Sequence, residues 1–146
     1  MIDIVEVPET VLASVRARVA WPELPRAIRA GLDRVYAFLR AAPVRPAGHN
    51  VCVYRAPAPD GIELEAGVPV SGRFEGEAGV ACSATPSGRA AHIVHMGRYE
   101  DLGAASTALA QFCRARGEGA PVVVWEVYGD WAEDPARLRT DVYQLL

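Results

Sequence analysis

The run VVVWEVY at residues 122–128 decides the fold, because its β-branched and aromatic side chains predict a buried β-strand. Side chains alternate between the two faces of a strand, so Glu126 and Tyr128 share one face while Trp125 lies on the other. A carboxylate inside such a strand is costly to desolvate unless it is paired, protonated or facing a cavity. Glu126 is therefore our candidate for the polar centre of a ligand pocket. The alternative is a surface acid that opposes an arginine at a sheet edge or points to solvent.

Two segments of the chain carry apolar residues at helical spacing. The first helix is predicted over about 23–42, since Pro25 is tolerated in a first helical turn and Pro43 forbids continuation. The second helix is predicted over about 100–114, and Gly117 ends it. Both helices are expected to pack one side against a sheet.

Strand-like runs rich in β-branched and aromatic residues surround the helices. They lie at 10–18, 50–55, 62–70, 80–85, 90–95, 122–128 and 140–146. The order strand, helix, strand, strand therefore occurs twice within one domain, in halves at about 1–75 and 76–146. This repeat predicts an α+β fold of two pseudo-symmetric βαββ units. A cleft at the pseudo-symmetry axis would be a natural place for a ligand.

The composition is that of a globular protein, with 51% apolar residues among 146 and a formal net charge of −3. The basic residues are interleaved with acids and form no stripe, so we expect no direct binding of nucleic acid. The longest apolar run is too short to span a bilayer, and the acidic start MIDIVE at 1–6 is unlike a signal peptide. We therefore expect a cytoplasmic protein that does not contact membranes.

The cysteines and histidines point away from metal and cofactor chemistry. The three cysteines have no CxxC spacing, and they are typical of small buried residues in a reducing compartment: Cys52, Cys82 and Cys113. The three histidines lack clustered partner cysteines or carboxylates, so no metal site is expected. The chain has neither a P-loop nor a dinucleotide-binding fingerprint, and we expect no cofactor.

The sequence HMGRYE at 95–100 follows a strand and opens the second helix. Gly97 permits a positive φ at the turn, and the acids after it suit a helix N-terminus. The structural interpretation of His95 is a ring that bonds to the backbone at this turn, and it is favoured over a catalytic role. No serine or cysteine lies in the context of a nucleophile elbow.

Several aromatic side chains are candidates to surround Glu126. Tyr54 and Tyr128 occupy matching positions of the two halves, Tyr143 lies in the closing strand, and Trp125 precedes the acid. Each aromatic residue alone is more often core than ligand platform, but their coincidence around one acid indicates a ligand site. A carboxylate near a bound cation contributes about 4 kcal/mol at an effective dielectric of about 20, and aromatic faces add roughly 0.5–2 kcal/mol each.

Two of these motifs carry a family resemblance. The sequence at 95–100 resembles the H-x-G-P-Y-E turn of the GyrI-like family. Domains of this family also occur as the effector-binding domain of AraC-type and multidrug-sensing regulators. WEVY at 125–128, followed by Pro135 and a final strand, resembles that family's ending. The likeness covers essentially the whole chain. It departs from the family at Arg98, where proline is usual, and at Phe112, where tryptophan is common; neither change removes the pocket acid.

The resemblance implies two βαββ units that form a curved antiparallel sheet, with both helices on one face and a central ligand groove. It also implies that Glu126 contacts the ligand with aromatic residues alongside, and that Tyr143 matches a pocket tyrosine of some relatives. Cys52 and Tyr54 are assigned to the groove from the internal repeat. The expected ligand-binding residues are Glu126, Tyr128, Tyr54, Cys52, Tyr143, Trp125 and His95.

Three functions are compatible with this resemblance. The first is a stand-alone sensor, sequestering or resistance protein that binds hydrophobic small molecules, cationic or planar ones among them; no helix-turn-helix precedes the first strand, so regulation would need a separate regulator. The second is a hydrolase that opens the cyclopropane ring of DNA-alkylating natural products, with Glu126 as general base and Tyr128 or Tyr143 as hydrogen-bond donor. The third is a protein that shields gyrase. We rank binding first and expect a monomer or weak dimer.

Overall fold

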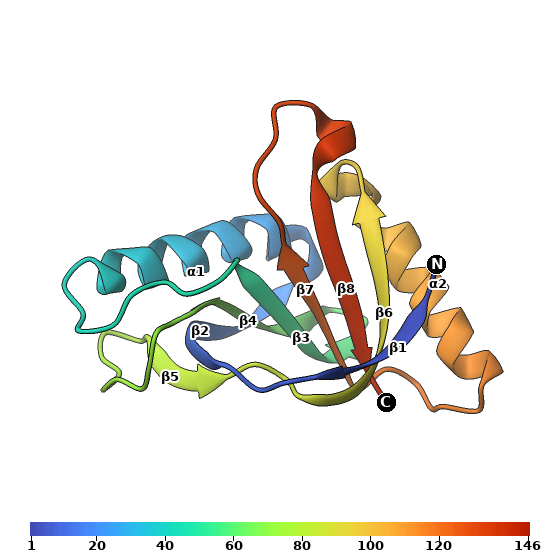
Figure 1. The fold of residues 1–146 in the computed structure, drawn as a ribbon, viewed down its shortest axis with the longest axis horizontal. Helices are drawn as coiled ribbons and strands as arrows, with labels where there is room; N and C mark the ends of the chain where they lie inside the picture. Colours follow the sequence, from blue (N-terminus) through green and yellow to red (C-terminus); the bar gives the residue numbers. More distant parts are fainter. The chain divides into compact units, whose positions relative to one another are not determined.

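The computed structural model describes all 146 residues and arranges them in two compact units. The first unit, the N-unit, comprises Glu9–Thr85; the second, the C-unit, comprises Met1–Pro8 together with Pro86–Leu146. Each unit is an antiparallel arrangement of four strands with one α-helix, whose elements are labelled in Figure 1. The α+β class predicted from the sequence is confirmed.

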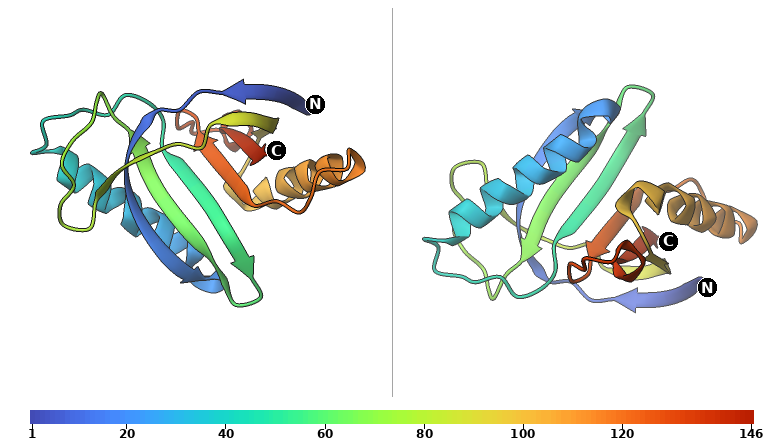
Figure 2. Two further views of the ribbon diagram at one scale, coloured as in Figure 1. Left: turned by 90° about the horizontal axis from the view of Figure 1, so that it is seen from below. Right: turned by 90° about the horizontal axis from the view of Figure 1, so that it is seen from above.

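The N-unit runs from a strand through a helix into a hairpin. Its elements are β2 (Val11–Ala20), the 3₁₀ turn η1 (Trp21–Glu23), α1 (Leu24–Leu39), β3 (Val51–Ala58), β4 (Gly61–Pro69) and β5 (Ala81–Ala84). The strands lie in the order β3-β4-β2-β5, and α1 lies across them in Figure 2. The β3–β4 hairpin requires glycine where β4 begins, because a Cβ on Gly61 would clash with the Val19 carbonyl oxygen.

The C-unit repeats this plan with different connections. Its elements are β1 (Asp3–Val7), β6 (Gly88–Met96), η2 (Tyr99–Asp101), α2 (Leu102–Ala115), β7 (Val123–Tyr128), η3 (Pro135–Arg137) and β8 (Arg139–Leu145). The strands lie in the order β7-β8-β6-β1. The helix ends as predicted, with Gly117 in the left-handed region at φ +81°.

The predicted βαββ repeat is present as β2-α1-β3-β4 and β6-α2-β7-β8, but the edge strands are exchanged between the repeats. Strand β1 precedes β2 in the chain, yet it pairs with β6. Strand β5 precedes β6 in the chain, yet it pairs with β2. The units are therefore divided at 8/9 and 85/86, not in sequence halves at 75/76. Strand β1 lies outside the strands predicted from the sequence.

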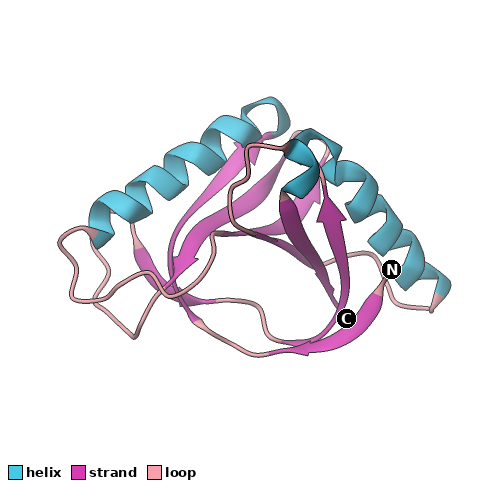
Figure 3. Ribbon diagram, turned by 45° about the horizontal axis from the view of Figure 1, so that its top comes forward, coloured by secondary structure: helices cyan, strands magenta, loops and turns pink.

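Each helix packs against one face of its own unit's sheet, as Figure 3 shows with the helices in cyan and the strands in magenta. The core of the N-unit gathers the buried side chains of Ala13, Val35, Leu39, Val44, Val68, Val70 and Val80. The core of the C-unit gathers those of Ala91, Leu102, Ala105, Leu109, Cys113 and Val142. Neither helix is long and apolar enough to cross a membrane. The central groove expected between the two halves stays a prediction.

Candidate functional site

Glu126 lies on β7 and is buried, with 8% of its surface exposed. It stands opposite Val142, a member of the core beneath α2, so its side chain belongs to the helix-covered face of the C-unit sheet. The Tyr128 hydroxyl donates a hydrogen bond of 2.6 Å to Glu126 Oε1. The predicted alternation is therefore correct, and the solvent-facing alternative for Glu126 is wrong.

Tyr128 connects this acid to a second aromatic side chain. The rings of Tyr99 and Tyr128 meet edge to face, with their centroids 5.8 Å apart and their planes at 83°. Tyr99 opens η2 and is 42% exposed, whereas Tyr128 is half-buried. Tyr99 belongs to the turn motif HMGRYE but is not among the ligand-binding residues predicted from the sequence. Its aromatic contact with Tyr128 could not be read from the spacing, because η2 folds back toward the end of β7.

Thr140 lies beside Tyr128 on the neighbouring strand β8, and His95 lies opposite it on β6. The Thr140 side chain is fully buried, and its hydroxyl has no hydrogen-bond partner in the structure. A buried hydroxyl without a partner is unfavourable by about 1–3 kcal/mol. The helix-covered face thus holds a polar atom that the folded chain itself does not satisfy.

His95 takes the structural role that the turn motif indicated. Its Nε2 lies 3.0 Å from the carbonyl oxygen of Arg98, and because a carbonyl only accepts, Nε2 carries the hydrogen. Gly97 between them has φ +141°, a conformation that favours glycine. This hydrogen bond stabilises the turn between β6 and η2 and thereby fixes the position of Tyr99.

Trp125 and Tyr143 lie on the opposite face of the C-unit sheet, turned away from α2. Their rings stack at 4.9 Å with an interplanar angle of 8°, and Tyr143 also stacks on His92 at 4.7 Å. The structure therefore does not bring Tyr143 to the side of the sheet that carries Glu126. Of the two phenols considered as partners of the acid, Tyr128 is the one in contact with it.

A carboxylate network accompanies this aromatic stack. Asp141 accepts a 2.6 Å hydrogen bond from His92 Nε2 and two bonds of 3.0 Å from the Arg139 guanidinium. Burial opposes ionisation of Asp141, but the bonds from Arg139 and His92 outweigh it and lower its pKa. Burial, together with the negative charge of Asp141, raises the pKa of Tyr143. The stack is thus anchored by an ionised acid.

The first-half candidates, Cys52 and Tyr54, lie on β3 of the N-unit. They pair in register with Ala66 and Leu64, and Ala66 meets Gly31 of α1. Both side chains therefore share the face of the N-unit that α1 covers. Cys52 is fully buried and Tyr54 is half-buried. Their contact with a ligand stays a prediction.

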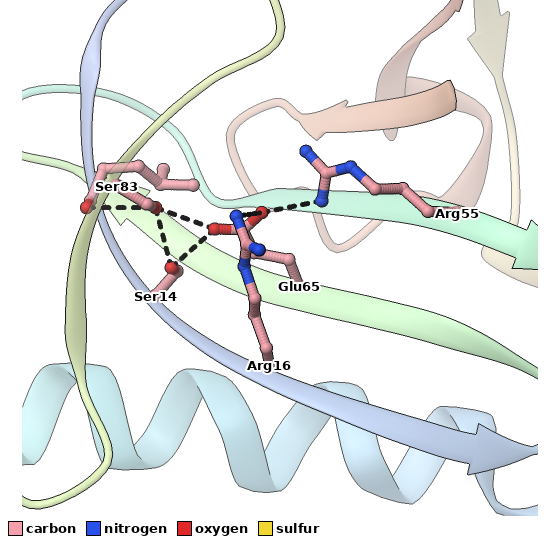
Figure 4. Close-up of polar contacts among 6 residues, drawn as sticks. Ser14, Arg16, Arg55, Glu65 and Ser83 are labelled. Carbon is pink, nitrogen blue, oxygen red and sulfur yellow. Dashed lines mark hydrogen bonds and ion pairs between the residues drawn. The ribbon is translucent and has the colours of Figure 1, made fainter. Parts of the chain in front are cut away.

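The strongest polar cluster of the N-unit was missed from the sequence. Glu65 on β4 is 1% exposed, and each of its carboxylate oxygens has two donors, as Figure 4 shows. The hydroxyls of Ser14 and Ser83 each lie 2.7 Å from Oε2. Arg55 and Arg16 reach Oε1 at 2.8 Å and 3.2 Å. Burial opposes ionisation of Glu65, but these four partners together lower its pKa.

An open pocket of about 280 Å³ lies beside this carboxylate, lined by Arg16, Ala17, Arg18, Arg55, Glu63, Leu64 and Glu65. The sequence did hold a signal for it. RAR at 16–18 and ELE at 63–65 both alternate charged and apolar residues, and they pair in register. Period-two alternation assigns their charges to one shared face. The strand at 62–70 was predicted only as a run rich in β-branched and aromatic residues, and its charged side chains were not assigned to a face.

These features define an α+β small-molecule-binding domain of paired βαββ units, with a buried acid among tyrosines. The chain belongs to the family described as the GyrI-like small molecule binding domain, whose model matches residues 1–144. A search of the curated proteins finds no match.

Solved structures agree on the fold. The crystal structure of the EcmrR C-terminal domain is 19% identical, with a TM-score of 0.80, over 99% of this chain and 95% of that one. EcmrR in a complex with DNA is 19% identical with a TM-score of 0.86, and there the chain spans only 56% of its relative. A hydrolase encoded by lin2189 from Listeria innocua is 14% identical with a TM-score of 0.62, over 98% and 90% of the two chains. SAV2435 bound to tetraphenylphosphonium is 8% identical with a TM-score of 0.62, over 99% and 92%.

Proposed function

We propose that this protein binds hydrophobic cations and that Glu126 is the acid that attracts them. The observation that carries the proposal is a carboxylate that is 8% exposed on a strand of apolar residues and is bonded to a tyrosine hydroxyl. In such surroundings a unit charge about 4 Å away contributes about 4 kcal/mol at an effective dielectric of 20. The ring of Tyr128 and the exposed ring of Tyr99 supply aromatic surface for the same ligand.

The comparisons support this choice of ligand class. The family is described as one that binds small molecules. SAV2435, which shares the fold, is bound to tetraphenylphosphonium, a lipophilic cation whose charge is spread under phenyl groups. An acid beside aromatic rings complements such a cation better than it complements a neutral molecule of the same shape.

Calorimetric titration with tetraphenylphosphonium tests the proposal. Glu126→Gln keeps the shape and removes the charge, so we expect affinity to fall by about tenfold or more. Glu100→Gln, an exposed acid on η2, is the matched control and should bind like the wild type. Triphenylphosphine oxide, a neutral aromatic compound, should show a much smaller difference between wild type and Glu126→Gln. Equal affinity of wild type and Glu126→Gln for the cation would show that the charge of Glu126 does not attract the ligand.

A second candidate function is hydrolysis of strained cyclopropane rings, and the Glu126–Tyr128 contact favours it. Glu126 would take a proton from water as the water oxygen bonds to a ring carbon and the ring carbon–carbon bond breaks. The Tyr128 hydroxyl would turn its single hydrogen from Glu126 to the conjugated carbonyl and stabilise the negative charge that develops there. A structural neighbour named as a hydrolase supports this candidate.

Loss of the cyclopropane chromophore measures turnover directly. The wild type should open the ring faster than buffer does, whereas Glu126→Gln should lose that activity. Tyr143→Phe should retain it, because Tyr143 lies on the other face of the sheet. Wild-type turnover no faster than buffer would leave binding as the sole proposed function.

A further inference from the structure

The Glu65 pocket lies on the face of the N-unit that is turned away from α1. Its lining comes from three neighbouring strands, with Arg16 and Arg18 on β2, Arg55 on β3 and Glu65 on β4. Nothing in the proposed cation site uses these residues. The proposed cation site relies on a carboxylate, whereas the groups around Glu65 that could bind a ligand are positively charged guanidinium groups. Figure 4 shows the guanidinium groups of Arg16 and Arg55 each reaching the carboxylate of Glu65 from a different strand.

Glu65 orients these arginines without exhausting their hydrogen-bonding capacity. Its two oxygens already receive two hydroxyls and two guanidinium groups, so the carboxylate is satisfied inside the protein. Each of Arg16 and Arg55 uses one terminal nitrogen for Glu65, whereas a guanidinium has five N–H donors. Arg55 is 29% exposed and Arg16 is 63% exposed, so their remaining donors are open to the pocket.

The charge distribution favours a negative ligand over a positive one at the inner end of the pocket. The pocket lining carries three positive charges, on Arg16, Arg18 and Arg55, against the two negative charges of Glu63 and Glu65. Arg18 at the outer end is paired with Asp60 at 3.5 Å, and its Nη1 donates to the Ala56 carbonyl. Glu63 is exposed and stands opposite Arg18 and Arg55, so its charge is screened by water and balanced by these two arginines. Two guanidinium groups fixed by one buried carboxylate form a preorganised fork for oxyanions.

We propose that this pocket is a second binding site, which takes an oxyanion: the carboxylate or phosphate group of a small molecule, held by Arg16 and Arg55. The buried Glu65 is its positioning residue, since its Oε1 pairs with both guanidinium groups and its carboxylate is already satisfied within the protein. The site lies entirely in the N-unit, so it is independent of Glu126.

Titration of the full chain with inorganic phosphate, at ionic strength held constant with chloride, tests the site by amide chemical shifts. We expect saturable shifts centred on Ala17 and Leu64, whose backbone lines the pocket. A parallel titration with citrate distinguishes carboxylate from phosphate as the preferred group. Arg16→Gln removes one exposed guanidinium and should weaken binding of the preferred anion by about tenfold. Arg29→Gln, on the exposed side of α1, is the matched control and should bind as the wild type does.

Arg55→Lys provides a second variant that keeps the charge beside Glu65 but loses the fork, and it should also weaken binding. Glu126→Gln should leave anion binding unchanged, which separates this inference from the proposed function. Non-saturable shifts, shifts elsewhere in the chain, or equal weakening in Arg16→Gln and Arg29→Gln would overturn the proposal, because each indicates general charge screening.

Discussion

The two units place carboxylates at equivalent positions of their helix-free faces and hold them in similar hydrogen-bond networks. Glu65 on β4 stands opposite Arg16, and Asp141 on β8 stands opposite Val94 in the same register. Each acid also accepts a hydrogen bond from the residue that precedes its cross-strand partner by two positions. This residue is Ser14 on β2 for Glu65 and His92 on β6 for Asp141. Both carboxyls have a lowered pKa. The helix-free face of each unit thus carries one ionised, well-bonded acid.

The helix-covered faces differ, and the difference indicates where ligand chemistry is concentrated. In the N-unit, Tyr54 pairs with Leu64, and Cys52 is the neighbour two places before it. In the C-unit, Tyr128 pairs with Thr140, and Glu126 takes the place of the cysteine. One repeat therefore keeps an apolar face under its helix, whereas the other has acquired a carboxylate and a hydroxyl. Burying such groups is unfavourable for folding, so their presence on only one repeat indicates that they serve a function.

Removing the Glu65 carboxylate should give the largest effect on stability. Glu65→Ala leaves Ser14 and Ser83 without their acceptor and separates two arginines from their counter-ion. We expect the free energy of unfolding to fall by about 3 kcal/mol, measured by urea denaturation. Glu65→Gln, which still accepts hydrogen bonds, should lose less. A loss below 1 kcal/mol for Glu65→Ala would show that the N-unit does not depend on its buried acid.

Asp141→Asn is the matching change in the C-unit and should be milder. The side chains of Asp141 and His92 are 17% and 15% exposed, so water can replace part of what the amide loses. The expected loss is about 1 kcal/mol by the same measurement. If Asp141→Asn destabilised the protein as much as Glu65→Gln, its counterpart in the N-unit, exposure would not explain the contrast between the two networks.

Acidification should remove the contribution of both carboxylate networks to stability. Each folded carboxyl has a lowered pKa, so its contribution to stability is present above the unfolded pKa and is lost as pH falls through the folded value. The stability difference between wild type and Glu65→Gln should therefore be largest near neutral pH and shrink as pH drops below the ordinary glutamate value of 4.5. Urea denaturation at several pH values measures it. A difference that grows toward acid pH would reverse the sign assigned to Glu65.

Features that depend on local periodicity could be predicted from the sequence, whereas features that depend on distant strand pairings could not. The alternation in VVVWEVY was enough to place Glu126 and Tyr128 on one face, because period-two geometry is local. The βαββ repeat followed from helical and strand periodicities for the same reason. The exchange of β1 and β5 was beyond reach, since both strands pair with partners distant in the chain. Glu65 was missed because its four partners come from three other strands.

Thr140→Val is the smallest change and tests the helix-covered face most directly. Valine has the shape of threonine without its hydroxyl, and the N-unit carries the apolar Leu64 at the equivalent position. Because the Thr140 hydroxyl is buried without a partner, we expect Thr140→Val to stabilise the unliganded protein by about 1 kcal/mol in urea denaturation. Thr140→Ser keeps the hydroxyl and should gain nothing. If Thr140→Val instead destabilised the protein, the hydroxyl would have a partner in solution, and only Glu126 would distinguish this face from its counterpart in the N-unit.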